Sequence, residues 1–317
     1  MIRTENLTKE YDGFKAVNNL TLQVEKGEIY GFLGPNGAGK TTTILMLLGI
    51  LKPTRGKIYL MGEELKKNPL KIKKRIGVVS EKQFIYKEMS AQEYLNFFAD
   101  LYKVENKEKR IDELLSAVNL LEIKKRKLGA FSRGMQQKLG FVRALLHNPE
   151  ILLLDEPVSG LDPTGIKQIR DLIKEENERG KTVFISSHLL SEVERLCDKV
   201  GIINKGKLLA EDTMDNLKAR LSDFVELEVE VSKIKKEIVD VLSSFKFVKE
   251  LKTRGNLLNL RVASNKDYRA QISQAITQQK GIVLGIKKKE MSLEDAFITI
   301  TQKNISLLTI SGKEVEK

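Results

Sequence analysis

The spacing of apolar residues changes three times along the chain. Up to residue 60, and again from Ile151 to about Leu209, short aliphatic runs predict strands that alternate with helices. Between Ser90 and His147, apolar residues recur every three or four positions, which predicts helices alone. From Glu226 they alternate strictly with charged residues, as in a half-exposed strand. The pattern predicts an α/β domain with a helical subdomain, followed by a smaller second domain.

The helical stretch begins with a capping signal. Ser90 and Glu93 are three residues apart, so each side chain can bond the backbone N–H of the other. The helix that follows has a broad apolar face, and we expect a second helix at about Lys107–Val118. We assign Phe97 and Phe98 to the core of this region rather than to a docking surface.

The C-terminal third has its own order of elements. The expected strands and helices are Glu226–Val231, a helix at Lys235–Ser244, Val248–Thr253, Asn256–Val262, a helix at Tyr268–Gln279, and Ile282–Lys287. This βαββαβ order predicts a small ferredoxin-like α+β domain. RNA-binding domains share the order, but the strand at residues 256–262 lacks the aromatic pair on which bases stack. We therefore expect domains at 1–220 and 222–300, a helical subdomain at about 85–148, and a weakly ordered tail at 301–317.

A glycine-rich loop follows the expected strand Glu28–Leu33 and precedes an apolar helix expected at Thr42–Ile50. The loop reads Gly34-Pro35-Asn36-Gly37-Ala38-Gly39-Lys40-Thr41. Its glycines let backbone N–H groups point at a phosphate, and the helix adds the positive end of its dipole. Lys40 supplies a charge for the β- and γ-phosphates, and Thr41 supplies a hydroxyl for Mg²⁺. The loop predicts binding of a nucleoside triphosphate.

The strand Ile151–Leu154 ends in two adjacent carboxylates, Asp155 and Glu156. Ligands in parallel sheets bind at the carboxyl ends of strands. Asp155 is placed to hold Mg²⁺ through water, and Glu156 to polarise an attacking water. A core strand with an acidic helix cap is the structural alternative, but the phosphate loop supplies the phosphates that these carboxylates would serve.

The composition indicates in which compartment the protein acts. The longest apolar runs, such as Ile44–Leu48, are far shorter than the roughly 18 residues that cross a bilayer, and the start lacks the apolar core of a signal peptide. One cysteine, Cys197, excludes an internal disulfide. We expect a cytoplasmic protein whose membrane role would need a partner chain.

The net charge of +12 raises a nucleic-acid alternative, but acidic residues are interleaved throughout, so we expect a solvated surface and no nucleic acid.

The segment Phe131-Ser132-Arg133-Gly134-Met135, before the acidic strand, resembles the signature motif of the ATP-binding cassette (ABC) family. Other pieces of that family's pattern follow in order: Tyr11, Ser159-Gly160-Leu161-Asp162, and His188 after the strand Thr182–Ser186. The segments around residues 155–163 and 187–194 are similar to ATPase subunits of drug, antibiotic and sodium exporters. In those exporters the membrane part is a separate chain.

The resemblance implies an ABC-type fold and a Mg²⁺-dependent ATPase that drives an exporter's permease from the inner face of the cell membrane. It implies ATP sites shared between two cassettes packed head to tail, here a homodimer. The expected nucleotide contacts are Tyr11, Gly34, Pro35, Asn36, Gly37, Ala38, Gly39, Lys40, Thr41 and Thr42, with Ser132 and Gly134 from the opposite chain. Glu156, His188 and Lys40 would be catalytic, and Thr41, Asp155 and Glu81 would face the metal.

Glu81 departs from the family pattern, which usually has Gln there. A carboxylate can still meet Mg²⁺ but adds a negative charge, and Gln83 is the alternative metal contact. The rival function is a soluble ABC ATPase acting on nucleic acid or ribosomes. Such proteins carry long coiled-coil insertions or two cassettes in one chain, and this chain shows neither.

Overall fold

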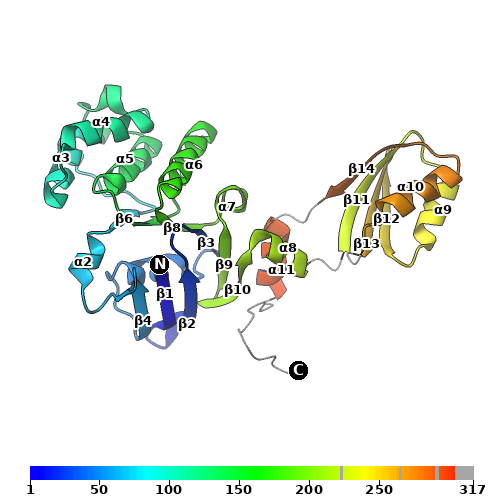
Figure 1. Ribbon diagram of the computed structural model, residues 1–317, viewed down its shortest axis with the longest axis horizontal. Coiled ribbons are helices and arrows are strands. Elements are labelled where there is room, and N and C mark those ends of the chain that lie inside the picture. The colour runs from blue at the N-terminus through cyan, green and yellow to red at the C-terminus, as the bar shows by residue number, and fades with distance from the viewer. Residues whose placement is uncertain (222–223, 264–265, 290–292, 304–317) are drawn as a thin grey trace. The chain divides into compact units, whose positions relative to one another are not determined.

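The computed structural model describes residues 1–221, 224–263, 266–289 and 293–303, which form two compact units (Figure 1). The first unit contains residues 1–214 and the described residues from Ile300 onward, and the second contains residues 215–299. The sequence placed this boundary slightly later, near residue 220. Residues 301–303, expected in the tail, end helix α11 (Leu293–Lys303), and the rest of that tail lies outside the described residues.

An antiparallel sheet of four strands begins the first unit, in the order β2-β1-β4-β5. Its strands are β1 (Ile2–Tyr11), β2 (Phe14–Val24), β4 (Arg55–Leu60) and β5 (Glu63–Glu64). In β2, buried and exposed residues alternate from Leu20 to Val24, so one face of the sheet covers the core.

A six-stranded sheet forms the centre of this unit, in the order β10-β9-β3-β8-β7-β6. Its strands are β3 (Ile29–Leu33), β6 (Ile76–Val79), β7 (Ile151–Asp155), β8 (Thr182–Ser187), β9 (Lys199–Asn204) and β10 (Lys207–Thr213). Every residue of β3, β7 and β8 is buried, which explains their continuous apolar runs. Because these three strands are parallel, their carboxyl ends meet at one edge.

Several helices lie together at the top of the first unit in this view, where they include the helical subdomain (Figure 1). The helices of the first 221 residues are α1 (Lys40–Leu47), α2 (Pro69–Lys73), α3 (Ala91–Tyr102), α4 (Lys107–Ala117), α5 (Arg133–Leu145), α6 (Pro163–Glu178), α7 (Leu190–Leu196) and α8 (Met214–Leu221), with short 3-10 turns at Leu121–Ile123 and Leu128–Ala130. The capping box of α3 is confirmed: Ser90 N donates to Glu93 Oε2 at 2.7 Å, and Glu93 N donates to Ser90 Oγ at 3.2 Å.

The assignment of Phe97 to the core is wrong. Its side chain is 51% exposed, whereas Phe98 is half-buried and packs its ring edge against Tyr94. The buried face of α3 carries Ala91, Tyr94, Leu95 and Ala99. At about 100° per residue, Phe97 points away from that face.

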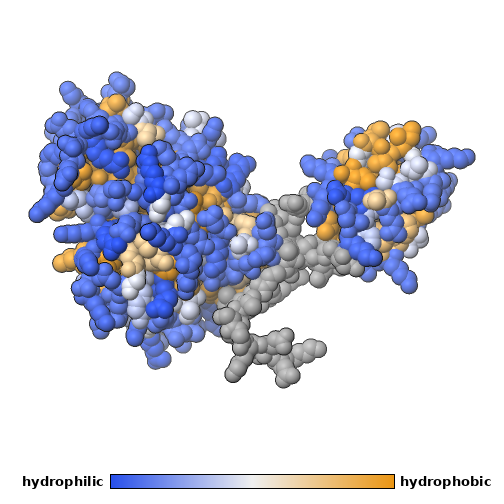
Figure 2. All heavy atoms as spheres, in the orientation of Figure 1, coloured by the Kyte–Doolittle hydropathy of each residue, from blue (hydrophilic) through white to orange (hydrophobic). Residues whose placement is uncertain are grey.

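The main core lies between the two sheets and α1. Tyr30 and Phe32 of β3 both contact the ring of Phe184 of β8, at centroid distances of 5.5 and 5.4 Å. Truncating a buried phenylalanine such as Phe184 to alanine would cost about 3–5 kcal/mol. The visible surface of each unit is mainly hydrophilic, with small apolar areas (Figure 2). Among the described residues, no helix combines the length and the apolar character needed to cross a bilayer.

The second unit has the expected βαββαβ order. Between α8 and α11, its elements are β11 (Phe224–Val231), α9 (Lys236–Ser244), β12 (Val248–Arg254), β13 (Leu257–Ala263), α10 (Arg269–Gln278) and β14 (Val283–Lys289). The sheet is antiparallel in the order β12-β13-β11-β14, and its inner face forms a separate apolar core with α9 and α10. The unit therefore has the core that an independently folding domain requires.

Candidate functional site

The predicted phosphate loop connects β3 to α1, and two of its glycines are required by close backbone contacts. A Cβ on Gly34 would lie 2.4 Å from the carbonyl oxygen of Ile203, and one on Gly39 would lie 2.5 Å from that of Ala16. Gly39 also has a φ of 110°, which allows it to cap α1. The helix therefore begins at Lys40 rather than at the expected Thr42. Thr41 and Thr42 lie in its first turn, where N–H groups have no partner within the helix.

Lys40 is buried beneath this loop. Its ammonium donates to the carbonyl oxygens of Gly34 at 2.8 Å and Pro35 at 3.3 Å. It also lies 3.9 Å from Oε1 of Glu156. Burial lowers the pKa of Lys40, while the carboxylates of Glu156, Asp155 and Glu81 act in the opposite direction. The amine is therefore placed among the residues expected to handle phosphate and metal.

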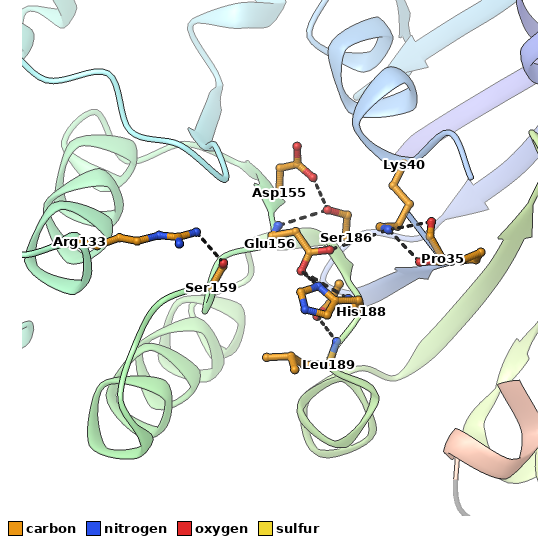
Figure 3. Close-up of polar contacts among 11 residues, drawn as sticks. Pro35, Lys40, Arg133, Asp155, Glu156, Ser159, Ser186, His188 and Leu189 are labelled. Atoms are coloured by element: carbon orange, nitrogen blue, oxygen red, sulfur yellow. Dashed lines mark hydrogen bonds and ion pairs between the residues drawn. The ribbon is translucent and has the colours of Figure 1, made fainter. Parts of the chain in front are cut away.

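Asp155 and Glu156 follow one another at the end of β7, and a buried hydroxyl from β8 contacts both. Ser186 Oγ donates to Asp155 Oδ1 and accepts the backbone N–H of Glu156 at 3.2 Å. That N–H also donates to the carbonyl oxygen of Ser186 at 3.1 Å. Glu156 has a φ of 49°, a left-handed conformation that costs a non-glycine residue about 1–2 kcal/mol. Figure 3 shows this group beside Lys40.

Sequence reasoning missed Ser186. It was read only as the end of an apolar strand, because its contact with Asp155 depends on the pairing of β7 with β8. One signal was available: a polar residue ends an otherwise apolar strand, two residues before His188.

His188 contacts the predicted general base directly. Its Nδ1 lies 2.7 Å from Oε2 of Glu156, and its backbone N–H donates to the same oxygen at 3.4 Å. Burial raises the pKa of the Glu156 carboxyl, and the nearby His188 and Lys40 oppose that shift. A carboxylate with a raised pKa is a better proton acceptor. The structure thus brings Lys40, Asp155, Glu156 and His188 together.

Tyr11 lies at the tip of the β1–β2 hairpin and is 45% exposed, with the Lys9 ammonium 4.9 Å from its ring centroid. The same hairpin continues to Ala16, whose carbonyl approaches Gly39 of the phosphate loop. The ring is accessible, as a stacking role requires.

Ser132 and Gly134 begin the signature helix α5. Ser132 is its N-cap, and Ser132 Oγ accepts the backbone N–H of Met135 at 3.3 Å. Between them, Arg133 Nη2 donates to Ser159 Oγ at 3.0 Å and lies over Gly160. Figure 3 shows Arg133 across the carboxylates from Lys40. The signature thus contacts the Ser159–Gly160 loop of its own chain.

Glu81 is exposed in the loop after β6, and its charge acts on Lys40. Gln83 is turned instead towards α5, where its Oε1 accepts Arg143 Nη2 at 3.3 Å. This contact favours Glu81 over Gln83 as the residue facing the metal. Within the described parts of the chain, no group of three or more His, Cys, Asp or Glu side chains could hold a metal.

Comparison with known proteins agrees with the family resemblance of the sequence motifs. The model of the ABC transporter family matches residues 17–159. The bacitracin transport ATP-binding protein BcrA of Bacillus licheniformis is 44% identical over 301 residues, covering 95% of this chain and 97% of that protein. The lantibiotic transport ATP-binding protein SrtF of Streptococcus pyogenes is 39% identical over 215 residues, covering 68% of this chain and 92% of that protein.

Solved structures show the same fold. A dimeric post-hydrolysis state of the ATP-binding cassette MJ0796, bound to ADP and Pi, superposes with a TM-score of 0.63 at 27% identity. The match covers 68% of this chain and 99% of that one.

Proposed function

Because this chain belongs to the ABC transporter family, we propose that two identical copies bind ATP head to tail and drive a separate export permease, with Glu156 as general base. ATP hydrolysis and the transport role follow from the family and from the antibiotic-transport relatives. The homodimer and the roles of individual residues are our proposal. It rests above all on one observation, the convergence of Lys40, Glu156 and His188 at the ends of β3, β7 and β8.

The residues of the site suit ATP with Mg²⁺. A Cβ on Gly34 or Gly39 would obstruct the loop, and Lys40 supplies positive charge beneath it. Mg²⁺, which would neutralise phosphate charge, would be held by Thr41 and Asp155, with Glu81 facing it. Phosphate and water oxygens would complete the shell of such a metal, so the protein would not need to supply three or more ligands. Among the described residues no group of three His, Cys, Asp or Glu side chains is placed to do so.

The position of the signature supports a shared site. Ser132 and Gly134 flank Arg133, which contacts the Ser159–Gly160 loop of its own chain across the carboxylates from Lys40. We infer that they close over the triphosphate bound by the other copy. Glu156 would then accept a proton from the attacking water, and Lys40 would stabilise charge on the phosphates. His188, already bonded to Glu156, would orient that carboxylate.

Exposed aromatic side chains offer a surface for the permease at the inner face of the membrane. Phe84 and Tyr86 in the loop after β6 are 86% and 60% exposed, and Phe97 of α3 is 51% exposed. The rings of Tyr86, Tyr94, Phe98 and Phe97 contact one another in that order, so the buried ring of Tyr94 and the half-buried ring of Phe98 join the exposed Tyr86 to the exposed Phe97. Contiguous exposed apolar groups mark interaction sites more often than solvated surface.

Two relatives are named as ATP-binding proteins of bacitracin and lantibiotic transport, and these names support a cargo class for this chain. We propose a peptide antibiotic as the exported substrate. The soluble alternative, acting on nucleic acid or ribosomes, has no support among these relatives.

Affinity purification from detergent-solubilised membranes tests the assignment. We expect a polytopic membrane protein to copurify, and the pair to hydrolyse ATP faster when a peptide antibiotic is added. Phe84→Ser should weaken copurification, whereas Lys138→Ala, a change on α5 that alters none of these aromatic residues, should not. Copurification of ribosomes or nucleic acid in place of a membrane protein would refute the transport assignment.

A further inference from the structure

Gln83 is half-buried in the loop after β6 and makes polar contacts at both ends of its amide. Its Nε2 donates to the carbonyl oxygen of Ser80 at 2.6 Å and to Oε1 of Gln137 at 3.3 Å. Its Oε1 accepts Arg143 Nη2 at 3.3 Å. Both ends of the amide are therefore fixed against the signature helix α5, which carries Gln137 and Arg143.

The absence of a side chain at Gly140 leaves room for the Gln83 amide against α5. A Cβ at position 140 would lie 2.5 Å from Cδ of Gln83 and 2.6 Å from its Oε1. Glycine inside a helix costs about 1 kcal/mol relative to alanine, so α5 would be more stable with a side chain there. The glycine lets Gln83 lie directly on the helix backbone.

Gln137 extends the contact to the catalytic segment. It is only 2% exposed, and its Nε2 donates to the carbonyl oxygen of Pro157 at 3.0 Å. Pro157 directly follows Glu156 in a turn closed by the hydrogen bond from Ser159 N to Glu156 O at 3.1 Å. Gln137 therefore fixes the turn that orients Glu156.

Arg143 extends the contact in the other direction. Its Nη1 donates to the hydroxyl of Tyr94 at 2.9 Å, and that hydroxyl donates to the carbonyl oxygen of Phe84 at 3.3 Å. Tyr94 is 1% exposed, whereas Phe84 is 86% exposed. One polar network thus runs from the exposed loop to the residue after Glu156.

We propose that Gln83 is a positioning residue that sets the orientation of Glu156 according to the position of the loop containing Phe84. This rests on the proposed role of Glu156 as general base. A buried network is sensitive to the loss of any member, because each loss leaves a polar partner unsatisfied. Gln83 acts here through Gln137 and Pro157 and not as a metal ligand.

Steady-state ATP hydrolysis by the full chain tests the proposal. We expect Gln83→Ala to lower kcat by about 10- to 100-fold, because a small displacement of a catalytic group is that costly. KM for ATP and the Mg²⁺ concentration for half-maximal rate should stay within about twofold, since phosphate and metal contacts are untouched. Gln83→Glu should behave alike: it can still accept from Arg143 but cannot donate to Gln137. Lys138→Ala on α5 is the matched control.

Gly140→Ala provides an independent variant, since its methyl group would displace the amide while favouring the helix. It should reproduce the fall in kcat with a melting temperature no lower than that of Gln83→Ala, and it should add nothing in a Gln83→Ala background. An unchanged kcat in Gln83→Ala, a changed Mg²⁺ requirement alone, or a full additional loss in the double variant would overturn the proposal. Wild-type turnover by Glu156→Gln, measured alongside, would instead remove the general-base assignment beneath it.

Discussion

Replacing Ser186 by alanine should damage the site through its carboxylates. The Ser186 hydroxyl is fully buried and donates to Asp155, which is only 6% exposed. A hydrogen bond to a charged group contributes about 1.5–3 kcal/mol, and the carboxylate would keep its charge with one donor fewer. The Glu156 N–H would lose less, because it also donates to the carbonyl oxygen of residue 186.

Ser187→Ala is the matched control. Ser187 is the next residue of the same strand and 2% exposed, but among the described residues its hydroxyl accepts only the backbone N–H of Leu189, at 3.0 Å. Losing this neutral hydrogen bond should cost about 1 kcal/mol. For a unit of this size, each kcal/mol shifts the melting temperature by about 2–4 °C. We expect a fall of about 3–12 °C for Ser186→Ala and about 2–4 °C for the control.

The Mg²⁺ dependence of ATP hydrolysis should also distinguish Ser186→Ala from Ser187→Ala. Ser186→Ala should raise the Mg²⁺ concentration for half-maximal hydrolysis several-fold, because Asp155 loses the donor that orients it, whereas Ser187→Ala should leave that concentration unchanged. Thermal unfolding and a Mg²⁺ titration of ATP hydrolysis measure both effects. Equal melting temperatures and equal Mg²⁺ requirements in the two variants would refute the reasoning.

Three further changes test other parts of the account. Glu81→Gln should keep ATP binding, because an amide oxygen can still ligate Mg²⁺, and should alter how ATP hydrolysis responds to the permease. Mg²⁺-dependent hydrolysis with and without the permease measures this effect. Loss of ATP binding would contradict the prediction. A chain ending near Ala219 should bind ATP but dimerise more weakly in ultracentrifugation. The shortened chain also loses the hydrogen bond from Asn204 to the Thr301 carbonyl, so Asn204→Ala in the full chain is the control. If the shortened chain dimerises as well as the full chain, a stabilising role for the second unit is excluded. Burial raises the pKa of Glu156, so the wild type loses stability as pH rises from the ordinary carboxyl range through the folded-state value. Glu156→Gln should therefore have a higher melting temperature than wild type at pH values above the folded-state pKa of Glu156, and the same melting temperature at pH values below the ordinary carboxyl pKa. A lower melting temperature at the higher pH values would show that the ion pairs of Glu156 with Lys40 and His188 outweigh the cost of burial.

Local motifs could be predicted from the sequence because their chemistry fixes the spacing. The phosphate loop is one continuous segment, and Asp155 and Glu156 are adjacent, so pattern and strand position suffice. The βαββαβ order of the second unit was likewise readable from strict alternation and helical spacing. The start of α1 was misplaced because it depends on the left-handed conformation of Gly39.

Contacts between distant segments could not be read in this way. Ser186 meets Asp155 only through the register of β7 against β8. Gln83 meets Gly140 only when the loop after β6 packs on α5. Phe97 was misassigned because apolar spacing marks a broad helix face but not which part of it the core covers.

The central claim is that Glu156 activates water in an ATP site that two copies of this chain complete. Phosphate release and size-exclusion chromatography of Glu156→Gln with Mg²⁺ and ATP test it most directly. Turnover should fall by about 10²- to 10⁴-fold, the usual contribution of a general base, while ATP binding persists and the chain elutes as a dimer only with ATP. Wild-type turnover, or a monomer that binds ATP without dimerising, would contradict the account.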